Sequence, residues 1–192
     1  MPEPRPEVLE FLRTRRSRPA KTLTMPVPPR DEVEKLLTIA ARSPDHGKLE
    51  PWRFIVLEKA ALTRLAALVV ELSAGKDLPE EKLEKARRQF ADADLVIAVV
   101  ASPVPSEKVP EVEQILSAGA VCLALLNGAL ASGWGANWLT GWMARDREFL
   151  RRGLGVEAHE FVAGFIHIGT ETITPPERPR PDVAAKIQWV RE

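Results

Sequence analysis

The spacing of apolar side chains divides the chain into helical and extended segments. Apolar positions that recur every three or four residues predict helices, and proline or acidic residues stand where several of them begin. The helices are expected at residues 5–14, 31–42, 59–73, 78–90, 111–131 and 145–153. Runs rich in β-branched and aromatic residues predict strands at 52–58, 94–102 and 161–169, with a short strand inside 133–142. Strands separated by helices at irregular intervals indicate an α+β protein, with a mixed sheet and helices on both of its faces.

No charged residue occurs from Ile115 to Ala144, so this stretch has to be compared with a membrane span. Only about 17 of its positions form one continuous helical pattern, which is short for a span, and the flank at Glu111 and Glu113 is acidic. A buried central helix is therefore the favoured interpretation. Its small residues would let a second helix approach closely; they are Ala118, Gly119, Ala120, Ala124 and Gly128.

The composition is typical of a globular protein. The 192 residues are 45% hydrophobic and 28% charged, and a chain of this length most simply forms one domain, residues 1–192. The formal net charge is zero, so we expect no nucleic acid partner and no membrane partner. The N-terminus has no apolar core of a signal peptide, and one cysteine excludes an intrachain disulfide, so a cytoplasmic protein is expected. Cys122, inside an apolar segment, is expected to be a buried and unreactive thiol.

Glycines and tryptophans are concentrated in GWGANWLTGW, residues 133–142. Gly133 and Gly135 follow a predicted helix and the sixth position of the motif is Trp138, so the dinucleotide-binding order of strand, G-x-G-x-x-G and helix is absent. Three tryptophans and three glycines in ten residues would let the backbone approach a flat ligand that aromatic rings cover. Core tryptophans at a strand edge would explain the same residues.

A basic cluster, RTRRSRPAK at residues 13–21, closes the first predicted helix. The helix dipole favours one or two cations at this end, but five of the nine residues are basic. Arginine offers a planar fork that matches phosphate oxygens, and Ser17 adds a hydroxyl. The cluster is thus either an anion site or a solvated basic turn.

The loop SPDHGKLEPW, residues 43–52, carries four ionisable side chains between two prolines. A metal site would need three or four convergent ligands, and the other histidines, His159 and His167, lie far along the chain. No strand–turn–helix elbow supports a Ser–His–Asp triad. A glycosidase would need two facing carboxylates, and Asp45 and Glu50 are equally typical of a solvated turn.

The C-terminal segment, residues 171–192, is predicted to be an extended arm. It contains the proline-rich sequence PPERPRP and ends with the apolar residues Ile187, Trp189 and Val190. An apolar end after an extended arm indicates docking on a partner subunit, and a frayed end is the alternative.

These motifs, in this order, resemble the FMN-binding sequence of the nitroreductase family, and in particular its compact branch. The resemblance covers nearly the whole chain. It begins with RRS at residues 15–17 and continues with SPDHGKLEPWRF at 43–54, GWGANWLTG at 133–141 and GFIHIGT at 164–170. RRS alone has little specificity, but the ordered set is fairly specific.

The resemblance implies the nitroreductase-like α+β fold, with a mixed and mostly antiparallel sheet flanked by helices, in an intertwined homodimer. It also implies FMN, bound without a covalent bond at the interface of the two subunits. By this analogy Arg15, Arg16 and Ser17 bind the phosphate, the ribityl chain and the pyrimidine edge. His46 and Glu50 approach the same flavin from the other subunit.

The second part of the implied site comes from the middle and the end of the chain. Trp138, Leu139 and Thr140 pass close to the flavin ring, and Gly141 allows that approach. Arg178 or Arg180, in the arm, completes the phosphate site. The family activity is the ping-pong reduction of nitroaromatic, quinone or similar electrophilic substrates with NAD(P)H, and the flavin N5 atom rather than a side chain is the reactive centre. An FMN carrier or redox-sensing protein with little turnover is the alternative function.

Two features depart from the family pattern. Relatives commonly have an amide where this chain has Glu50, whose carboxylate could accept the flavin N3–H or turn toward Arg53 or Lys48. The segment 73–90 is short, which implies a reduced helical cover and a more open pocket. A specialised relative that cleaves reduced flavin or removes halogen would usually need an extended lid, and no such lid is evident in this sequence.

Overall fold

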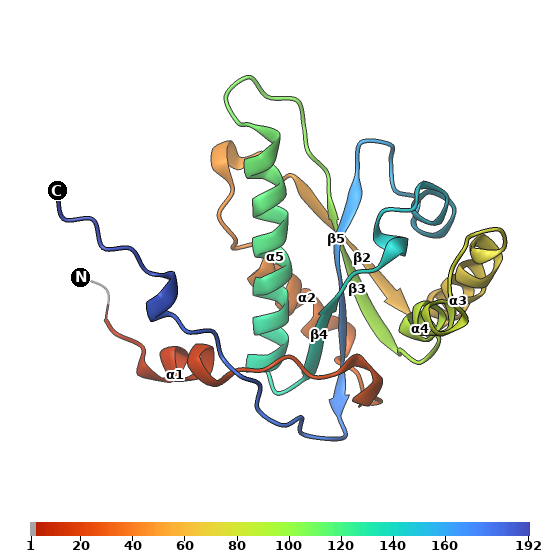
Figure 1. Ribbon diagram of the computed structural model, residues 1–192, viewed down its shortest axis with the longest axis horizontal. Helices are drawn as coiled ribbons and strands as arrows, with labels where there is room; N and C mark the ends of the chain where they lie inside the picture. Colours follow the sequence, from red (N-terminus) through yellow and green to blue (C-terminus); the bar gives the residue numbers. More distant parts are fainter. Residues whose placement is uncertain (1–2) are drawn as a thin grey trace.

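The computed structural model describes residues 3–192, which form an α+β fold around one antiparallel sheet (Figure 1). The strands are β1 (Leu23–Thr24), β2 (Trp52–Glu58), β3 (Leu95–Ala101), β4 (Gly135–Leu139) and β5 (Phe161–Glu171). The α-helices are α1 (Pro6–Thr14), α2 (Arg30–Ala40), α3 (Lys59–Ser73), α4 (Glu80–Ala91) and α5 (Glu111–Ala131). Four short turns of 3₁₀-helix, Ala20–Thr22, His46–Lys48, Trp142–Ala144 and Ala184–Lys186, and a π-helix, Phe149–Leu154, complete the described elements.

Strand β5 is the centre of the sheet. The strand order is β1-β5-β3-β2, and β4 pairs with β5 as well. All four strand pairs among residues 3–192 are antiparallel. The expectation of a mostly antiparallel sheet is therefore confirmed, and the parallel pairing that a mixed sheet implies does not occur among the described residues.

The helices cover the two faces of the sheet and build two apolar cores. Alternate residues of β3 point to opposite faces, so Val96 and Ala98 join the core under α3 and α4, whereas Ile97 and Val99 join the core under α2 and α5. Every residue of β3 is buried. This explains why the run of apolar residues at 95–101 shows no alternation, and it confirms the expected strand that is buried on both faces.

The structure differs from the sequence predictions at three places. Strand β1 was not predicted, because two residues carry no periodic pattern and only pairing with β5 makes them a strand. Helix α2 begins at Arg30 and ends at Ala40, two residues before the predicted end. The helix predicted at 145–153 is instead the π-helix Phe149–Leu154, where Gly153 packs so tightly that a Cβ would lie 2.8 Å from Leu65.

Helix α5 has one buried face and one exposed apolar face. Val121, Cys122 and Leu125 are fully buried in the core, which confirms the expected buried thiol, and burial raises the pKa of Cys122 to about 12. On the opposite face Val112 and Leu116 are 60% and 67% exposed. In the described part of the chain α5 is the one helix whose length and composition would allow it to cross a membrane, and half of its apolar window is buried in the protein.

An ion pair ties the start of β5 to β2 across β3. Arg53 donates from Nε and Nη2 to the two carboxylate oxygens of Glu160, at 2.7 and 2.6 Å, and the Glu157 N–H donates to the same carboxylate at 2.9 Å. The Glu160 side chain is only 3% exposed. The hydrogen bond with Arg53 is the main reason why the pKa of Glu160 falls to about 2.

Glu160→Gln is expected to lower the free energy of unfolding by about 2 kcal/mol at pH 7, because the half-exposed Arg53 loses a charged partner. The pKa of Glu160 lies below its ordinary value of 4.5, so its contribution is full above pH 4.5 and is lost as the pH falls toward 2. Urea denaturation at pH 7 and pH 3 should therefore show a smaller difference between wild type and variant at pH 3. Glu84→Gln, in an exposed helical pair with Arg87, is the control and should change stability little at either pH. An equal effect of Glu160→Gln at both pH values would contradict the assignment.

Candidate functional site

The basic segment after α1 is fastened to the start of β4. The Arg18 N–H donates to the Ala136 carbonyl at 2.8 Å, and Asn137 Nδ2 donates to the Arg18 carbonyl at 2.6 Å. Arg18 also pairs with Glu171, at the end of β5, at 3.0 Å. These bonds hold the RRS residues beside the sheet, although they lie in an irregular segment of the chain.

Two guanidinium groups in this segment have donors without a partner. Arg15 donates from Nη2 to Ser17 Oγ at 3.0 Å, but its Nε and the Nη1 of Arg16 are buried and unbonded within residues 3–192. A buried donor without an acceptor is costly, and a charged one more so. The arrangement is what an anion with several oxygens would satisfy.

The C-terminal arm brings further charge to the same place. Burial, and next the charge of Arg180, lower the pKa of Arg15. Glu177 pairs with Arg180 at 3.0 Å, and the backbone N–H of Arg178, followed by the charges of Arg180 and Arg16, lowers the pKa of Glu177. Arg178 contributes a backbone N–H to Glu177. Arg180 is thus the arm residue whose charge acts on Arg15, and the charges of Arg180 and Arg16 both act on the carboxylate of Glu177.

The loop with His46 is held in an unusual backbone conformation by Asp45. The Asp45 carboxylate accepts the backbone N–H groups of Leu49 and Glu50 at 3.2 and 2.8 Å. Lys48 and Glu50 both have positive φ, 55° and 49°, which side chains other than glycine adopt rarely. The turn is therefore determined by its own carboxylate, and this presents the side chain of Glu50 to solvent.

Within one chain, His46 and Glu50 are separate from the arginine cluster formed by Arg15, Arg16 and Arg180. His46 Nδ1 lies 2.7 Å from Glu113 Oε2, near the start of α5. Arg53 is bonded to Glu160, so it is not the partner of Glu50. No hydrogen bond or ion pair in the described chain joins His46 or Glu50 to Arg15 or Arg16.

Strand β4 and the turn after it place the four remaining predicted residues. Trp138 lies on Gly164 of β5, and its Nε1 donates to the Ala163 carbonyl at 3.3 Å. Leu139 ends the strand, and Thr140 and Gly141 follow it at the surface. Gly141 has a φ of 139°, which favours glycine at this position.

Thr140 and Gly141 line a cavity of about 240 Å³. Its other walls come from α5, from Arg145 and from the beginning of β5, including Ile115, Gly119 and Phe161. Neither Arg145 nor Phe161 is among the site residues predicted from the sequence. The available signal was that Arg145 is the first charged residue after the uncharged stretch that ends at Ala144.

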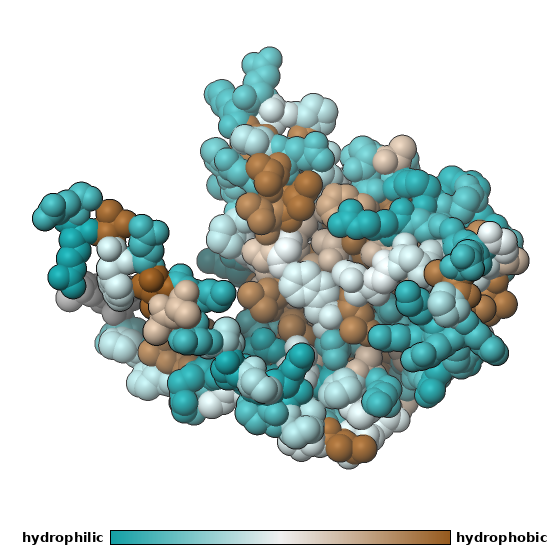
Figure 2. Space-filling view, in the orientation of Figure 1, coloured by the Kyte–Doolittle hydropathy of each residue, from teal (hydrophilic) through white to brown (hydrophobic). Residues whose placement is uncertain are grey.

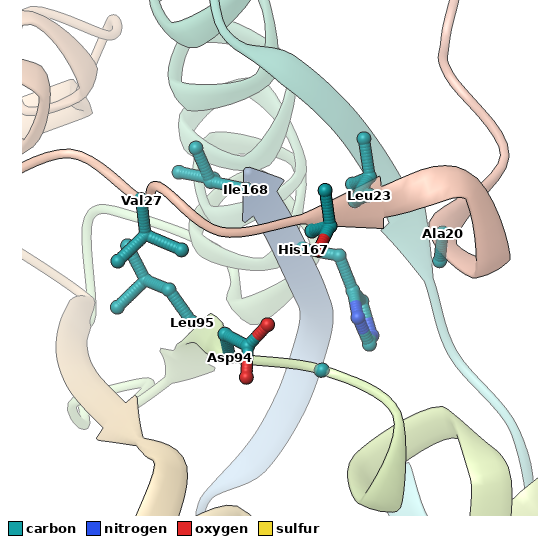
Figure 3. A pocket seen from close by; sticks show the side chains of 9 residues that line it. Ala20, Leu23, Val27, Asp94, Leu95, His167 and Ile168 are labelled. Carbon is teal, nitrogen blue, oxygen red and sulfur yellow. The ribbon is translucent and has the colours of Figure 1, made fainter. Parts of the chain in front are cut away.

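A second, much smaller cavity adjoins His167 of β5 (Figure 3). The imidazole is 2% exposed, and its Nε2 has no partner among the described residues. The cavity volume of about 10 Å³ holds no more than a water molecule. Asp94 lies on the same cavity and is paired with Lys59 at 3.2 Å. Residues 3–192 contain no group of three or more His, Cys, Asp or Glu side chains placed to hold a metal ion.

Comparisons with known proteins agree with the fold and the motifs. The nitroreductase family profile matches residues 12–170. A Haemophilus influenzae protein named "Putative NAD(P)H nitroreductase" is 39% identical over 166 residues, which are 85% of this chain and 88% of that protein. "Putative NAD(P)H nitroreductase YdjA" of Escherichia coli K12 is 33% identical over the same shares.

A solved structure of a nitroreductase with bound FMN, from Bacteroides fragilis, has a TM-score of 0.73. It is 20% identical in sequence, and the match covers 96% of this chain and 99% of that one. At 20% sequence identity this similarity shows a shared fold and nothing further. The family profile spans most of the chain and both relatives exceed 30% identity over most of their length, so the chain belongs to the nitroreductase family.

Proposed function

We propose that this protein is an FMN-dependent NAD(P)H oxidoreductase of the cytoplasm that reduces nitroaromatic, quinone or similar electrophilic substrates by a ping-pong mechanism. The observation that carries the proposal is the pair of buried, unbonded donors on Arg15 and Arg16, next to Arg180. A phosphate with several oxygens would accept them, and arginine forks suit it. The names of the curated relatives and the FMN in the Bacteroides fragilis structure support the same activity.

The residues of the chain fit FMN beyond its phosphate. Trp138, Leu139 and Thr140 would lie against the flavin ring, and the backbone at Gly141 would approach it without a side chain in between. FMN, when bound, accepts a hydride from NAD(P)H and passes the electrons to the electrophile. The protein would bind the cofactor, orient its ring toward the cavity beside Thr140 and leave proton supply to water.

A second copy of the chain would complete this site. Exposed apolar side chains occur on α1 (Val8, Leu9, Leu12), on α5 (Val112, Leu116, Leu123) and at the end of the arm (Ile187, Trp189, Val190). Figure 1 shows α1 and the arm extending away from the sheet, and Figure 2 shows brown side chains over α5 and the terminal segments. We propose a homodimer in which residues 171–192 dock on the partner, and in which His46 and Glu50 face the flavin held by the arginine cluster of the other subunit.

Visible spectroscopy under anaerobic conditions tests this function. The purified protein is mixed with FMN, separated from free cofactor, and titrated with NADH and then with NADPH. We expect retained FMN that is bleached by at least one nicotinamide and reoxidised by a nitroaromatic or a quinone. A protein that takes up no FMN would refute the proposal, and tight binding with very slow reduction by both nicotinamides would favour an FMN carrier. Light scattering of the same sample measures the dimer.

Arg15→Ala and Arg16→Ala are each expected to weaken FMN binding by about 1–3 kcal/mol, because each removes a charged donor from the phosphate. Affinity is measured by fluorescence quenching of FMN on titration with apoprotein. Arg13→Ala is the matched control: Arg13 lies two residues earlier, its side chain is 73% exposed, and it pairs with Glu10 of its own helix. Unchanged FMN affinity in both test variants would show that the phosphate lies elsewhere.

A further inference from the structure

The cavity beside Thr140 contains a single charged residue. Its walls combine the aliphatic side chain of Ile115, the aromatic ring of Phe161 and small residues such as Gly119, Ala144 and Ala163. Arg145 is the only ionisable residue in the lining. Apolar side chains that surround one charged group are typical of a site that orients a small organic ligand.

The guanidinium group of Arg145 is positioned but not neutralised. It lies over the Phe161 ring, 5.5 Å from the centroid, a contact that keeps the group at the cavity wall. Within residues 3–192 it forms no hydrogen bond and no ion pair with a carboxylate. Arg147, two residues later, differs: its two terminal nitrogens donate to the carbonyls of Glu160 and Glu157 at 2.8 and 2.7 Å. Within one subunit, the donors of Arg145 are therefore free to bind a ligand.

We propose that Arg145 determines substrate specificity, by selecting aromatic electron acceptors that carry an anionic group such as a carboxylate. The inference rests on the proposed function, which places the flavin ring next to Thr140 and Gly141. The aromatic ring of the acceptor lies between Ile115 and Phe161. Its anionic group accepts hydrogen bonds from the planar guanidinium group of Arg145.

The size of the cavity favours a single-ring compound. About 240 Å³ is below the usual range for drug-sized ligands, roughly 300–1,000 Å³. The position of Gly119 leaves room on the α5 side, because a Cβ there would meet no atom within 4 Å. A nitrobenzoate is thus a suitable probe, and nitrobenzamide is its neutral counterpart of nearly equal shape.

Steady-state kinetics with the FMN-loaded protein provide the first test. The ratio of kcat/KM for 4-nitrobenzoate to that for 4-nitrobenzamide should fall about tenfold in Arg145→Ala, the usual effect of one charge-assisted pair. Arg145→Lys keeps the charge but loses the planar pair of donors. Its ratio of kcat/KM values should lie between those of the wild type and Arg145→Ala. Arg30→Ala is the control with the same change of charge; its side chain is 92% exposed on α2, and the ratio should stay that of the wild type. An unchanged ratio in Arg145→Ala would overturn the proposal.

A binding measurement separates this inference from the proposed function. Benzoate cannot accept electrons as a nitro compound does, so its affinity for the oxidised protein is independent of turnover. Calorimetry should show benzoate bound about tenfold more weakly by Arg145→Ala than by wild type, with no such difference for benzamide. This result would support the anion site even if neither nitro compound were reduced, which would refute only the proposed function. Equal benzoate affinities would refute the anion site.

The phosphate of NADPH is a second possible anion for the same guanidinium. The KM values for NADPH and NADH are therefore measured with 4-nitrobenzamide as acceptor. The proposal requires that Arg145→Ala leave the ratio of the two KM values within about twofold. A loss confined to NADPH, with the nitrobenzoate ratio unchanged, would assign Arg145 to the nucleotide and overturn selection of the acceptor.

Discussion

Gly164→Ala is expected to destabilise the protein by about 3 kcal/mol and to displace Trp138 from its place on β5. A Cβ at this position would overlap the Trp138 indole at Nε1 and lie 3.0 Å from the Cys122 sulfur. The backbone has little freedom to move away, because Gly164 pairs with Val99 of β3 and the next residue, Phe165, pairs with Leu139 of β4. Trp138 is one of the residues proposed to contact the flavin ring, so the variant should lose FMN affinity together with stability.

Urea denaturation measures the stability of this variant, and tryptophan fluorescence reports the displaced indole. A double-mutant cycle identifies the cause. In a Trp138→Leu background the overlapping indole is absent, so Gly164→Ala should cost clearly less than in the wild type. A wild-type unfolding curve for Gly164→Ala, with unchanged fluorescence, would contradict the expectation. Equal costs in both backgrounds would move the cause from Trp138 to Cys122.

Acid is expected to destabilise the wild type more than His167→Gln. His167 is fully enclosed in β5, and burial lowers its pKa from 6.5 to about 4. Above pH 6.5 the imidazole is neutral in both the folded and the unfolded chain. Between pH 6.5 and 4 only the unfolded chain binds the proton, so stability falls as the pH falls. The difference between pH 7 and pH 4 should be roughly 3 kcal/mol larger for the wild type than for the variant.

The measurement is urea denaturation at several pH values and one protein concentration. Subtraction of the variant curve removes the carboxylates that also titrate near pH 4, because both proteins contain them. His159→Gln replaces an exposed histidine just before β5 and should keep the pH dependence of the wild type. Parallel curves for wild type and His167→Gln would show that His167 is not the group that resists protonation.

Local patterns were sufficient for most helices and strands and for the family. The uniform apolar run of β3 predicted a strand buried on both faces, and the proline and acidic start at Pro79 and Glu80 placed α4 within two residues. The ordered motifs RRS, SPDHGKLEPWRF, GWGANWLTG and GFIHIGT indicated the family, because each is contiguous in the chain. These features depend on neighbours in the sequence, whose spacing is set by the geometry of a helix or a strand.

The candidate site was predictable only in part. The sequence predicts Arg15, Arg16 and an arm arginine at the phosphate, but it does not distinguish Arg178 from Arg180. The pairing of Arg180 with Glu177 and its effect on Arg15 distinguish them in the structure. Arg145 was not singled out, since nothing in its own segment shows that Phe161 and α5 meet it at one cavity.

Local sequence thus determined the type and approximate bounds of the elements and the family to which the chain belongs. The tertiary structure decided that Leu23–Thr24 is a strand, that residues 149–154 form a π-helix, that Arg53 binds Glu160 and that Arg145 faces a cavity. The physical reason is the range of the interactions. The spacing of apolar residues that predicts a helix or a strand involves only a few successive residues. Ion pairs, close glycine contacts and cavities depend on side chains that only packing brings together.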